Sequence, residues 1–207
     1  MKLLGNLRQG LLFVISAPAG TGKTTLVQML EEEFECIYRS ITYTTRPKRT
    51  EEKDGISYHY LTDQEFKKKK DQGFFLEDAQ VFDHHYGTGK DDINNLLKKN
   101  KHVVLIIDTQ GVKHLIEQNI PLISIFISPP SHNELEQRLK KRKSENKEQQ
   151  EKRLKWSEHE LEMIPWYDYH IINDDLATAY NVLRSILIAE EHKAKRVGDY
   201  VFRKSDD

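Results

Sequence analysis

The residues that point most directly to chemistry lie between positions 17 and 25, where small residues surround one lysine and three threonines. The segment fits the phosphate-loop pattern G-x-x-x-x-G-K-[ST], except that Ala17 stands where the first glycine is usual. Such a loop aims its backbone N–H groups at phosphate oxygens, and the helix after it adds a partial positive charge. Lys23 would reach the β- and γ-phosphates of a nucleoside triphosphate, and the Thr24 hydroxyl would be placed on Mg²⁺. The predicted triphosphate contacts are Ala17, Pro18, Ala19, Gly20, Thr21, Gly22, Lys23, Thr24 and Thr25.

The flanking segments favour this interpretation over the alternative, a glycine-rich turn without a ligand. A short apolar segment, Leu11–Ile15, precedes the loop, and an amphipathic helix is predicted from the loop to Phe34. Phosphate binding requires a strand, a loop and a helix in this order. Alanine fits the first position of the loop provided that its φ is negative.

The elements that must position this loop are short apolar segments alternating with amphipathic ones. Leu11–Ile15, Val103–Ile107 and Leu122–Ile127 are apolar on successive residues, which is typical of strands buried on both faces. Cys36–Ile41 and Tyr169–Ile172 are weaker strand candidates. Strands that alternate with helices predict an α/β fold in which helices flank a parallel sheet.

Helix signals lie between and after these strands. Thr62 with Glu65, and Ser131 with Glu134, each fit a capping box at the start of a helix. The first of these begins a predicted helix over Asp63–Gln72. Apolar residues at helical spacing predict the last helix, and they are Leu176, Tyr180, Leu183 and Leu187.

Length, charge and cysteine content exclude several classes of protein. The 207 residues predict one domain, or one domain with an insertion. The 32 Lys and Arg residues nearly cancel the 33 Asp and Glu residues, so no overall field favours nucleic acid or anionic lipid. No apolar run exceeds five residues, whereas a membrane span takes ~20. The lone Cys36 excludes an internal disulfide. We expect a cytoplasmic protein without a nucleic-acid, membrane or obligate protein partner.

Two regions interrupt the alternation of strands and helices. Residues 40–90 contain paired aromatic residues, turn residues and one short predicted helix, which indicates a small mixed subdomain inserted in the fold. Residues 138–155 contain nine Lys or Arg residues, three Glu and two Leu. Such a segment buries little surface, so we expect it to be exposed and mobile.

Further motifs, in their order along the chain, resemble those of the guanylate kinase family. They are Ser40–Arg49 with Asp54–Tyr58, Glu77–Gln80 with Tyr86–Thr88, Asp108–Val112 and Ile172–Leu176. The resemblance extends from about Leu11 to Ala189. It implies a P-loop core at 9–39, 91–130 and 156–190, a GMP-binding subdomain at 40–90 and a helical lid at 131–155. A polar C-terminal tail is expected at 191–207.

The resemblance also implies which residues bind the acceptor nucleotide. Thr42, Arg46, Arg49, Tyr58 and Tyr86 would hold the phosphate of GMP, and paired guanidinium groups suit a dianionic phosphate. An isolated arginine would more often lie on a solvated turn. The positions that match guanine and nucleoside contacts are Glu77, Thr88 and Asp108.

Residues near the lid would act on ATP. Arg138, Arg142 and Arg153 match the arginines that face the transferred phosphoryl group, where mobile cations stabilise developing charge. Asn173 and Asp174 match the loop that holds adenine, although by themselves they also fit a helix N-cap.

One departure from the family concerns the metal ion. The family usually has an acidic residue two positions before the aspartate of the third motif, and here that residue is Ile106. Mg²⁺ is still expected, held chiefly by Thr24, phosphates and water, because this ion keeps several waters.

Other features have simpler explanations. The basic run Lys67–Lys70 is flanked by acidic residues and predicts a solvated helix face. Adjacent His84 and His85 would point in different directions and make a poor metal pair. Trp156 and Trp166 are expected to pack in a core.

The sequence therefore predicts an ATP:GMP phosphotransferase that gives ADP and GDP in purine nucleotide metabolism and GMP recycling. Two alternatives stay open. Guanylate-kinase-like domains of scaffold proteins bind partners without catalysis, and Ile106 favours this alternative while the intact phosphate loop opposes it. A P-loop kinase for another phosphorylated small molecule is disfavoured by Glu77 and Thr88.

Overall fold

A five-stranded parallel sheet forms the centre of the computed structural model, which describes residues 2–140 and 147–197. Val14 pairs with Leu105 on one side and with Ser124 on the other, so β1 is the middle strand. The three segments predicted as buried strands are the three inner strands, which confirms them. The two weaker candidates are the edge strands, of which β2 is shorter than predicted. In spatial order the strands are β2 (Ile37–Arg39), β7 (His102–Ile106), β1 (Leu12–Ser16), β8 (Ile123–Ser128) and β9 (Tyr169–Ile172).

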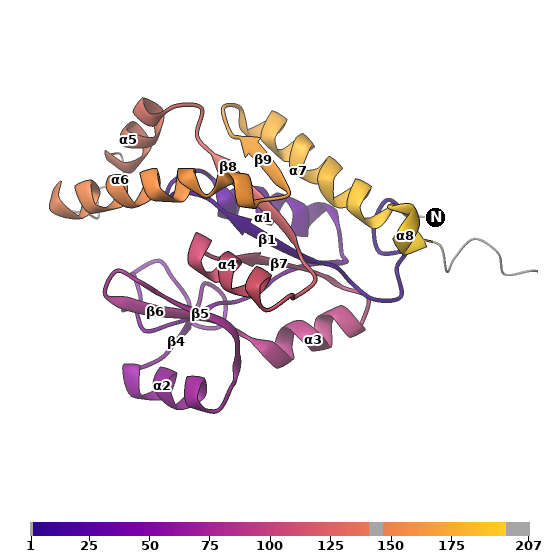
Figure 1. The fold of residues 1–207 in the computed structure, drawn as a ribbon, viewed down its shortest axis with the longest axis horizontal. Coiled ribbons are helices and arrows are strands. Elements are labelled where there is room, and N and C mark those ends of the chain that lie inside the picture. The colour runs from indigo at the N-terminus through magenta and orange to yellow at the C-terminus, as the bar shows by residue number, and fades with distance from the viewer. Residues whose placement is uncertain (1, 141–146, 198–207) are drawn as a thin grey trace, which may run out of the picture.

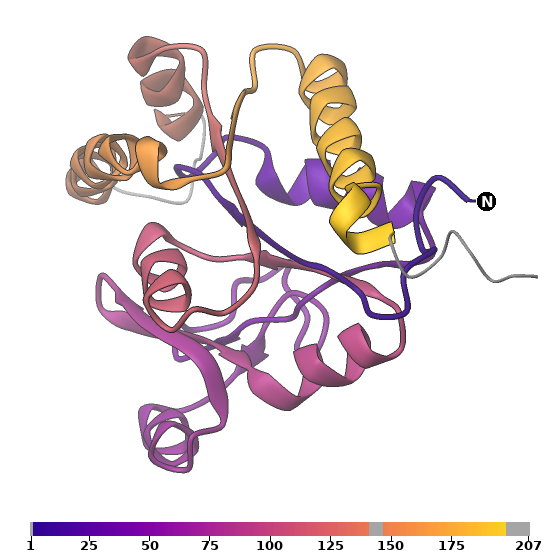
Figure 2. The same cartoon turned by 45° about the vertical axis from the view of Figure 1, so that its right-hand side comes forward.

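Helices cover both faces of this sheet (Figures 1 and 2). Alternate side chains of β1 point to opposite faces, as the geometry of a strand requires. Phe13 and Ile15 pack with α1 (Lys23–Glu33) and α7 (Leu176–Glu191). Leu12 and Val14 pack with α3 (Lys90–Lys98) and α4 (Thr109–Glu117). The predicted α/β class with a parallel sheet flanked by helices is confirmed.

A second sheet and a short helix occupy the region from 43 to 89. The sheet has the order β4-β3-β6-β5, with β3 parallel to β4 and antiparallel to β6. Its strands are β3 (Tyr43–Thr44), β4 (His59–Tyr60), β5 (Phe75–Val81) and β6 (His84–Gly89). Helix α2 (Asp63–Asp71) has the predicted capping box between Thr62 and Glu65, and it packs on the sheet through Phe66, which stacks on Phe75.

Helices α5 (His132–Lys140) and α6 (Lys147–Glu162) follow β8, and α6 extends beyond residue 155. At the start of α5, the Ser131 hydroxyl accepts a hydrogen bond from the Glu134 N–H. The Glu134 carboxylate, however, accepts from Arg138 Nε at 2.7 Å, because the guanidinium one turn later is the stronger partner. Only one half of the predicted capping box at Ser131 is therefore seen. A short helix η1 (Ile164–Trp166) leads into β9, and Trp166 is exposed, which corrects the expectation that it packs in a core.

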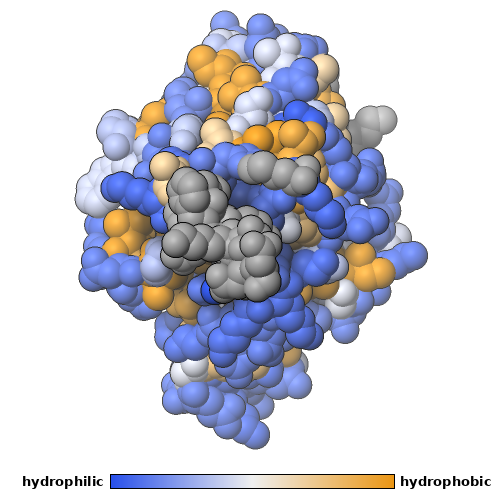
Figure 3. All heavy atoms as spheres, turned by 90° about the vertical axis from the view of Figure 1, so that its right-hand side faces the viewer, coloured by the Kyte–Doolittle hydropathy of each residue, from blue (hydrophilic) through white to orange (hydrophobic). Residues whose placement is uncertain are grey.

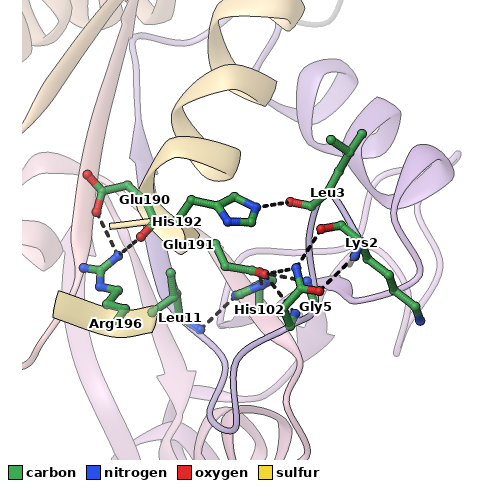
Figure 4. Close-up of polar contacts among 10 residues, drawn as sticks. Lys2, Leu3, Gly5, Leu11, His102, Glu190, Glu191, His192 and Arg196 are labelled. Carbon is green, nitrogen blue, oxygen red and sulfur yellow. Dashed lines mark hydrogen bonds and ion pairs between the residues drawn. The ribbon is translucent and has the colours of Figure 1, made fainter. Parts of the chain in front are cut away.

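The N-terminal segment meets the end of α7 at the edge of the core away from α5 and α6 (Figure 1). The predicted polar tail at 191–207 stays a prediction, and its residues 198–207 lie outside the described part of the chain. Glu191, the last residue of α7, is fully buried. Its carboxylate accepts hydrogen bonds from the N–H groups of Gly5 and Asn6 and contacts His102 Nε2 at 2.6 Å (Figure 4). Leu11 N–H donates to the other ring nitrogen of His102, so the ring carries its proton on Nε2 and donates it to Glu191. A short helix α8 (Ala194–Val197) follows.

Charged and polar side chains dominate the surface around these ends, and hydrophobic residues form separate small groups there (Figure 3). Within the described residues, no helix is both long enough and apolar enough to pass through a bilayer.

Candidate functional site

The phosphate loop connects β1 to α1 in the conformation that its sequence predicts. Gly20 and Gly22 have φ values of +86° and +88°, in the region where residues with a Cβ are strained. Ala17 does not have a positive φ, so alanine is accommodated at the first position. Gly22 is the N-cap of α1 and supplies no capping side chain, so the first turn of the helix presents its N–H groups to a ligand.

Side chains from other elements support this loop. Asn173, at the end of β9, is buried and donates from Nδ2 to the Thr21 carbonyl at 2.7 Å. A Cβ on Gly22 would lie 2.8 Å from the same nitrogen, so this glycine is also needed for close packing. Arg138 of α5 lies beside Gly20 and donates to the Asn173 carbonyl at 3.2 Å. Lys23 Nζ donates to the carbonyls of Ala17 and Pro18 within the loop.

A cleft of about 880 Å³ opens in front of the loop. One wall is the phosphate loop from Ala19 to Thr25, and Arg138 lies on the same side. The other wall comes from the chain after β2 and from the second sheet, and it includes Thr42, Arg46, Arg49, Tyr58 and Tyr86. All five residues predicted to hold the acceptor phosphate therefore face the phosphate loop across one cleft.

Glu52 holds the arginine side of the cleft in place. Its carboxylate forms two hydrogen bonds with Arg46 Nη2, at 2.7 and 2.9 Å, and accepts from the Arg49 N–H and the Tyr60 hydroxyl. Burial alone would raise the pKa of Glu52, but the hydrogen bonds from Arg46, the Arg49 backbone and Tyr60 lower it to about 2. The guanidinium of Arg46 also lies over the Tyr58 ring, 5.2 Å from its centroid. Sequence reasoning missed Glu52.

A smaller cavity of about 220 Å³ continues from the cleft towards β5. Glu77 lines this cavity, although only 3% of the residue is exposed. Glu77 and Thr88 are direct cross-strand partners in the β5–β6 hairpin, and Thr88 Oγ1 donates to Glu77 Oε1 at 2.6 Å. Burial raises the pKa of Glu77 to about 7, against the lowering effect of this hydrogen bond. Thr88 is fully buried and holds Glu77 without reaching the wall of either cavity.

Asp108, which follows β7, also lines the smaller cavity, and its negative charge contributes to the raised pKa of Glu77. As the N-cap of α4 its carboxylate accepts from the Gly111 N–H at 2.9 Å and from Gln110 Nε2 at 3.0 Å. Burial raises the pKa of Asp108, although these hydrogen bonds oppose the rise. Ile106, at the position where the family usually has an acidic residue, lines both cavities with an apolar side chain.

Three residues of α6 complete the smaller cavity, and sequence reasoning did not assign them to a site. They are Trp156, Ser157 and Glu160. Trp156 is half-buried on a cavity wall, so the expectation of a packed core residue is wrong for it too. A polar segment with one tryptophan gave no signal for this placement.

Some predicted residues are not brought to the cleft. Asp174 is exposed and lies on the wall of neither cavity, and Asn173 supports the loop from behind. Arg142 lies outside the described residues. Arg153 belongs to α6, but its side chain also lies outside the described part of the structure.

The two cavities meet at six residues that line both, namely Ala19, Lys23, Thr42, Tyr58, Tyr86 and Ile106. A phosphate loop that faces two arginines across one cleft is the arrangement of a P-loop kinase, in which two phosphorylated substrates are held side by side.

Comparison with known proteins narrows this class. The family model "Guanylate kinase" matches residues 9–190. A guanylate kinase of Protochlamydia amoebophila (strain UWE25) is 47% identical over 196 residues, which cover 95% of this chain and 99% of the relative. One of Chlamydia muridarum (strain MoPn / Nigg) is 47% identical and covers 88% of this chain and 89% of its own. The crystal structure of guanylate kinase from Anaplasma phagocytophilum has a TM-score of 0.76 at 31% identity, covering 92% and 90% of the two chains. The chain belongs to the guanylate kinase family.

Proposed function

We propose that this chain transfers the γ-phosphoryl group of ATP to GMP, giving ADP and GDP. The observation that carries the proposal is the junction of the two cavities at Lys23. A triphosphate on the loop and a monophosphate beside Arg46 and Arg49 would meet at this lysine. The membership of the guanylate kinase family supports the choice of substrates. Both substrates are small nucleotides, and we place the activity in the cytoplasm because the lone Cys36 fits a reducing compartment.

The loop from Ala17 to Thr25 would bind the phosphates of ATP. Its glycines let the backbone approach closely, and the uncapped first turn of α1 supplies N–H donors. Lys23 neutralises charge on the β- and γ-phosphates. Asn173 fixes the loop, and Asp174 stays a predicted adenine contact.

The acceptor site would bind both the phosphate and the guanine base of GMP. Arg46, held by Glu52, and Arg49 pair with the phosphate, together with hydroxyls of Thr42, Tyr58 and Tyr86. The Glu77 carboxylate accepts hydrogen bonds from guanine N1–H and the 2-amino group, while Thr88 orients it. Asp108 lines the same cavity, where it can accept a hydrogen bond from the nucleoside.

In the reaction, an oxygen of the GMP phosphate attacks the γ-phosphorus of ATP, and the bond from that phosphorus to the β–γ bridging oxygen breaks. The attacking oxygen is already ionised, so no general base is needed. Catalysis consists of positioning and charge neutralisation. Lys23 and Arg138 lie on the cleft for this task, and Arg142 and Arg153 are predicted to join them.

Mg²⁺ fits the site as an ion that accompanies the nucleotide. Thr24 offers its hydroxyl at the exposed start of α1, and Ile106 supplies no oxygen. Among the described residues, no group of three or more His, Cys, Asp or Glu side chains is arranged to hold a metal ion. Thr24 would therefore hold Mg²⁺ together with phosphate oxygens and water. When bound, the ion neutralises charge on the β- and γ-phosphates.

The test is a coupled assay of the parent protein with ATP and each of GMP, AMP, CMP and UMP. A site that pairs buried polar groups rejects an analogue lacking them by ~10⁴ or more, so GMP should exceed AMP in kcat/KM by that factor. Lys23→Ala should lose at least ~10²-fold in kcat while remaining folded by circular dichroism. Phosphorylation of AMP within about tenfold of GMP would contradict the choice of substrate. Retention of kcat by Lys23→Ala would contradict the role of the loop.

A further inference from the structure

The smaller cavity is enclosed from one side by α6 and by the tip of the β5–β6 hairpin. Trp156, Ser157 and Glu160 contribute from α6, and Phe82 contributes from the hairpin. None of these residues belongs to the family motifs named in the sequence analysis. Figure 1 shows the hairpin and α6 on the same side of the molecule. The residues of this wall therefore have no role in the proposed phosphoryl transfer.

Two aromatic rings meet in this wall. The Trp156 and Phe82 ring centroids are 5.8 Å apart with planes inclined at 53°, a favourable arrangement for an aromatic pair. Phe82 adopts a φ of +55°, which is a rare conformation for a bulky residue, and glycine or asparagine would be usual there. Local strain of this kind persists where the surroundings require it, often at ligand sites. The strained turn aims a large ring at Trp156.

Trp156 meets the smaller cavity through the carbon atoms of its ring. The residue is half-buried and lines the cavity, whereas its indole nitrogen is buried and has no hydrogen-bond partner among the described residues. The same cavity is lined by the carboxylates of Glu77 and Asp108. A nucleoside has polar edges and a flat base with an apolar face, on which an aromatic ring can pack. A nucleoside in this cavity could therefore pair its polar groups with the carboxylates and contact the indole with its apolar surface.

We propose that Trp156 is a binding residue for the acceptor nucleoside, and that Phe82 positions it from the hairpin tip. The indole packs the carbon atoms of its ring against the nucleoside. The inference rests on the proposed function of the smaller cavity as the guanine pocket. It links α6 to selection of the acceptor, whereas the family motifs place this selection in the 40–90 subdomain.

The experiment uses the two tryptophans of the chain. Trp166 is 54% exposed and lines neither cavity, so Trp166→Phe leaves Trp156 as the sole indole reporter and also serves as the matched control. In this variant, GMP should change the Trp156 emission with a midpoint near its KM, and ATP alone should not. In the parent background, Trp156→Ala should raise KM for GMP about tenfold or more, the scale of a lost pocket contact, with KM for ATP unchanged.

Two further variants separate the parts of the wall. Trp156→Phe keeps an aromatic ring in the wall, so it should raise KM for GMP less than Trp156→Ala does. Phe82→Ala should weaken GMP binding in the same direction and reduce the emission change. The inference is overturned if GMP saturates Trp166→Phe kinetically without changing its emission, or if Trp156→Phe and Trp156→Ala both keep the parent KM. If Glu77→Gln also keeps the parent KM for GMP, the function of the cavity itself is wrong, and the two failures are thereby distinguished.

Discussion

At the scale of single residues, the site works through carboxylates whose ionisation is set by their partners. Glu77 and Glu52 have the same side chain and opposite pKa shifts. Burial raises the pKa of Glu77 to about 7, because only Thr88 compensates it. At Glu52 burial acts in the same direction, but Arg46, the Arg49 backbone and Tyr60 lower the pKa to about 2. Glu77 can therefore accept hydrogen bonds from a ligand, whereas Glu52 holds Arg46.

GMP binding should release a proton from Glu77. Guanine presents two donors, so it needs the ionised carboxylate, which is about half populated at pH 7 and scarce at pH 6. The Kd for GMP should therefore fall about tenfold from pH 6 to pH 8. Calorimetry at pH 7 in buffers of different ionisation enthalpy should detect release of about half a proton.

The phosphate of GMP can also exchange a proton on binding, because its second ionisation lies at roughly pH 6. Glu77→Gln is the control for this contribution. This variant keeps any proton exchange due to the phosphate and loses the part due to residue 77. Equal proton release by the parent and by Glu77→Gln would contradict the assignment of Glu77 as the residue that titrates.

Glu52→Gln should impair the acceptor site alone. The amide keeps some hydrogen bonds to Arg46 but removes their charge assistance, which is worth about 1–2 kcal/mol. We expect KM for GMP to rise about tenfold, with KM for ATP unchanged, as measured by steady-state kinetics. The adjacent Glu51 is exposed, so Glu51→Gln is a matched control that should behave as the parent does. If the two variants have the same KM for GMP, Glu52 does not hold Arg46 for the phosphate.

At the scale of elements, the sequence predicted what depends on local pattern. Inner strands such as Val103–Ile107 are apolar on successive residues because helices cover both of their faces, and this pattern needs no tertiary information. The phosphate loop is equally local, because its conformation depends on two glycines close in the sequence. Both predictions hold in the structure.

Contacts between distant elements could not be predicted in the same way. Glu77 and Thr88 meet because the β5–β6 turn fixes the register of the hairpin, and β5 is too polar after Leu76 to be recognised as a buried strand. Trp156 reaches the smaller cavity only because α6 runs past residue 155 beside the hairpin. A periodic pattern within one segment contains no information about which other segment lies opposite.

At the scale of the whole molecule, the nucleotide site and the contacts that join α7 to the N-terminal segment lie at opposite edges of the parallel sheet. The strands end at the site, where the phosphate loop follows β1 and Asp108 follows β7. His102 begins β7 at the other end, and there Glu191 connects α7 to the N-terminal segment (Figure 4). Binding groups thus lie at the carboxyl ends of the strands, as is general for open α/β sheets. The opposite edge holds α7 and the N-terminal segment together.

Glu191 should therefore matter for stability and not for catalysis. Glu191→Ala leaves the buried His102 and the N–H groups of Gly5 and Asn6 without their acceptor, which should cost about 3 kcal/mol. For a chain of this length, that cost corresponds to a fall in Tm of about 6–12 °C. Calorimetry would measure the fall, and KM for both nucleotides should be unchanged at a temperature where the variant is folded. Glu35→Ala, at an exposed position, is the control.

The pKa of Glu191 also determines how the free energy of unfolding changes at acidic pH. Burial would raise the pKa of Glu191, but hydrogen bonds from His102, Gly5 and Asn6 lower it from 4.5 to about 2. A lowered pKa contributes stability that is fully present above pH 4.5 and is lost as pH falls towards 2, amounting to about 3 kcal/mol. Denaturant titrations between pH 5 and pH 3 should show the parent losing more stability than Glu191→Gln, which has no carboxylate to protonate. If both lose stability in parallel, the link between α7 and the N-terminal segment does not depend on the charge of Glu191.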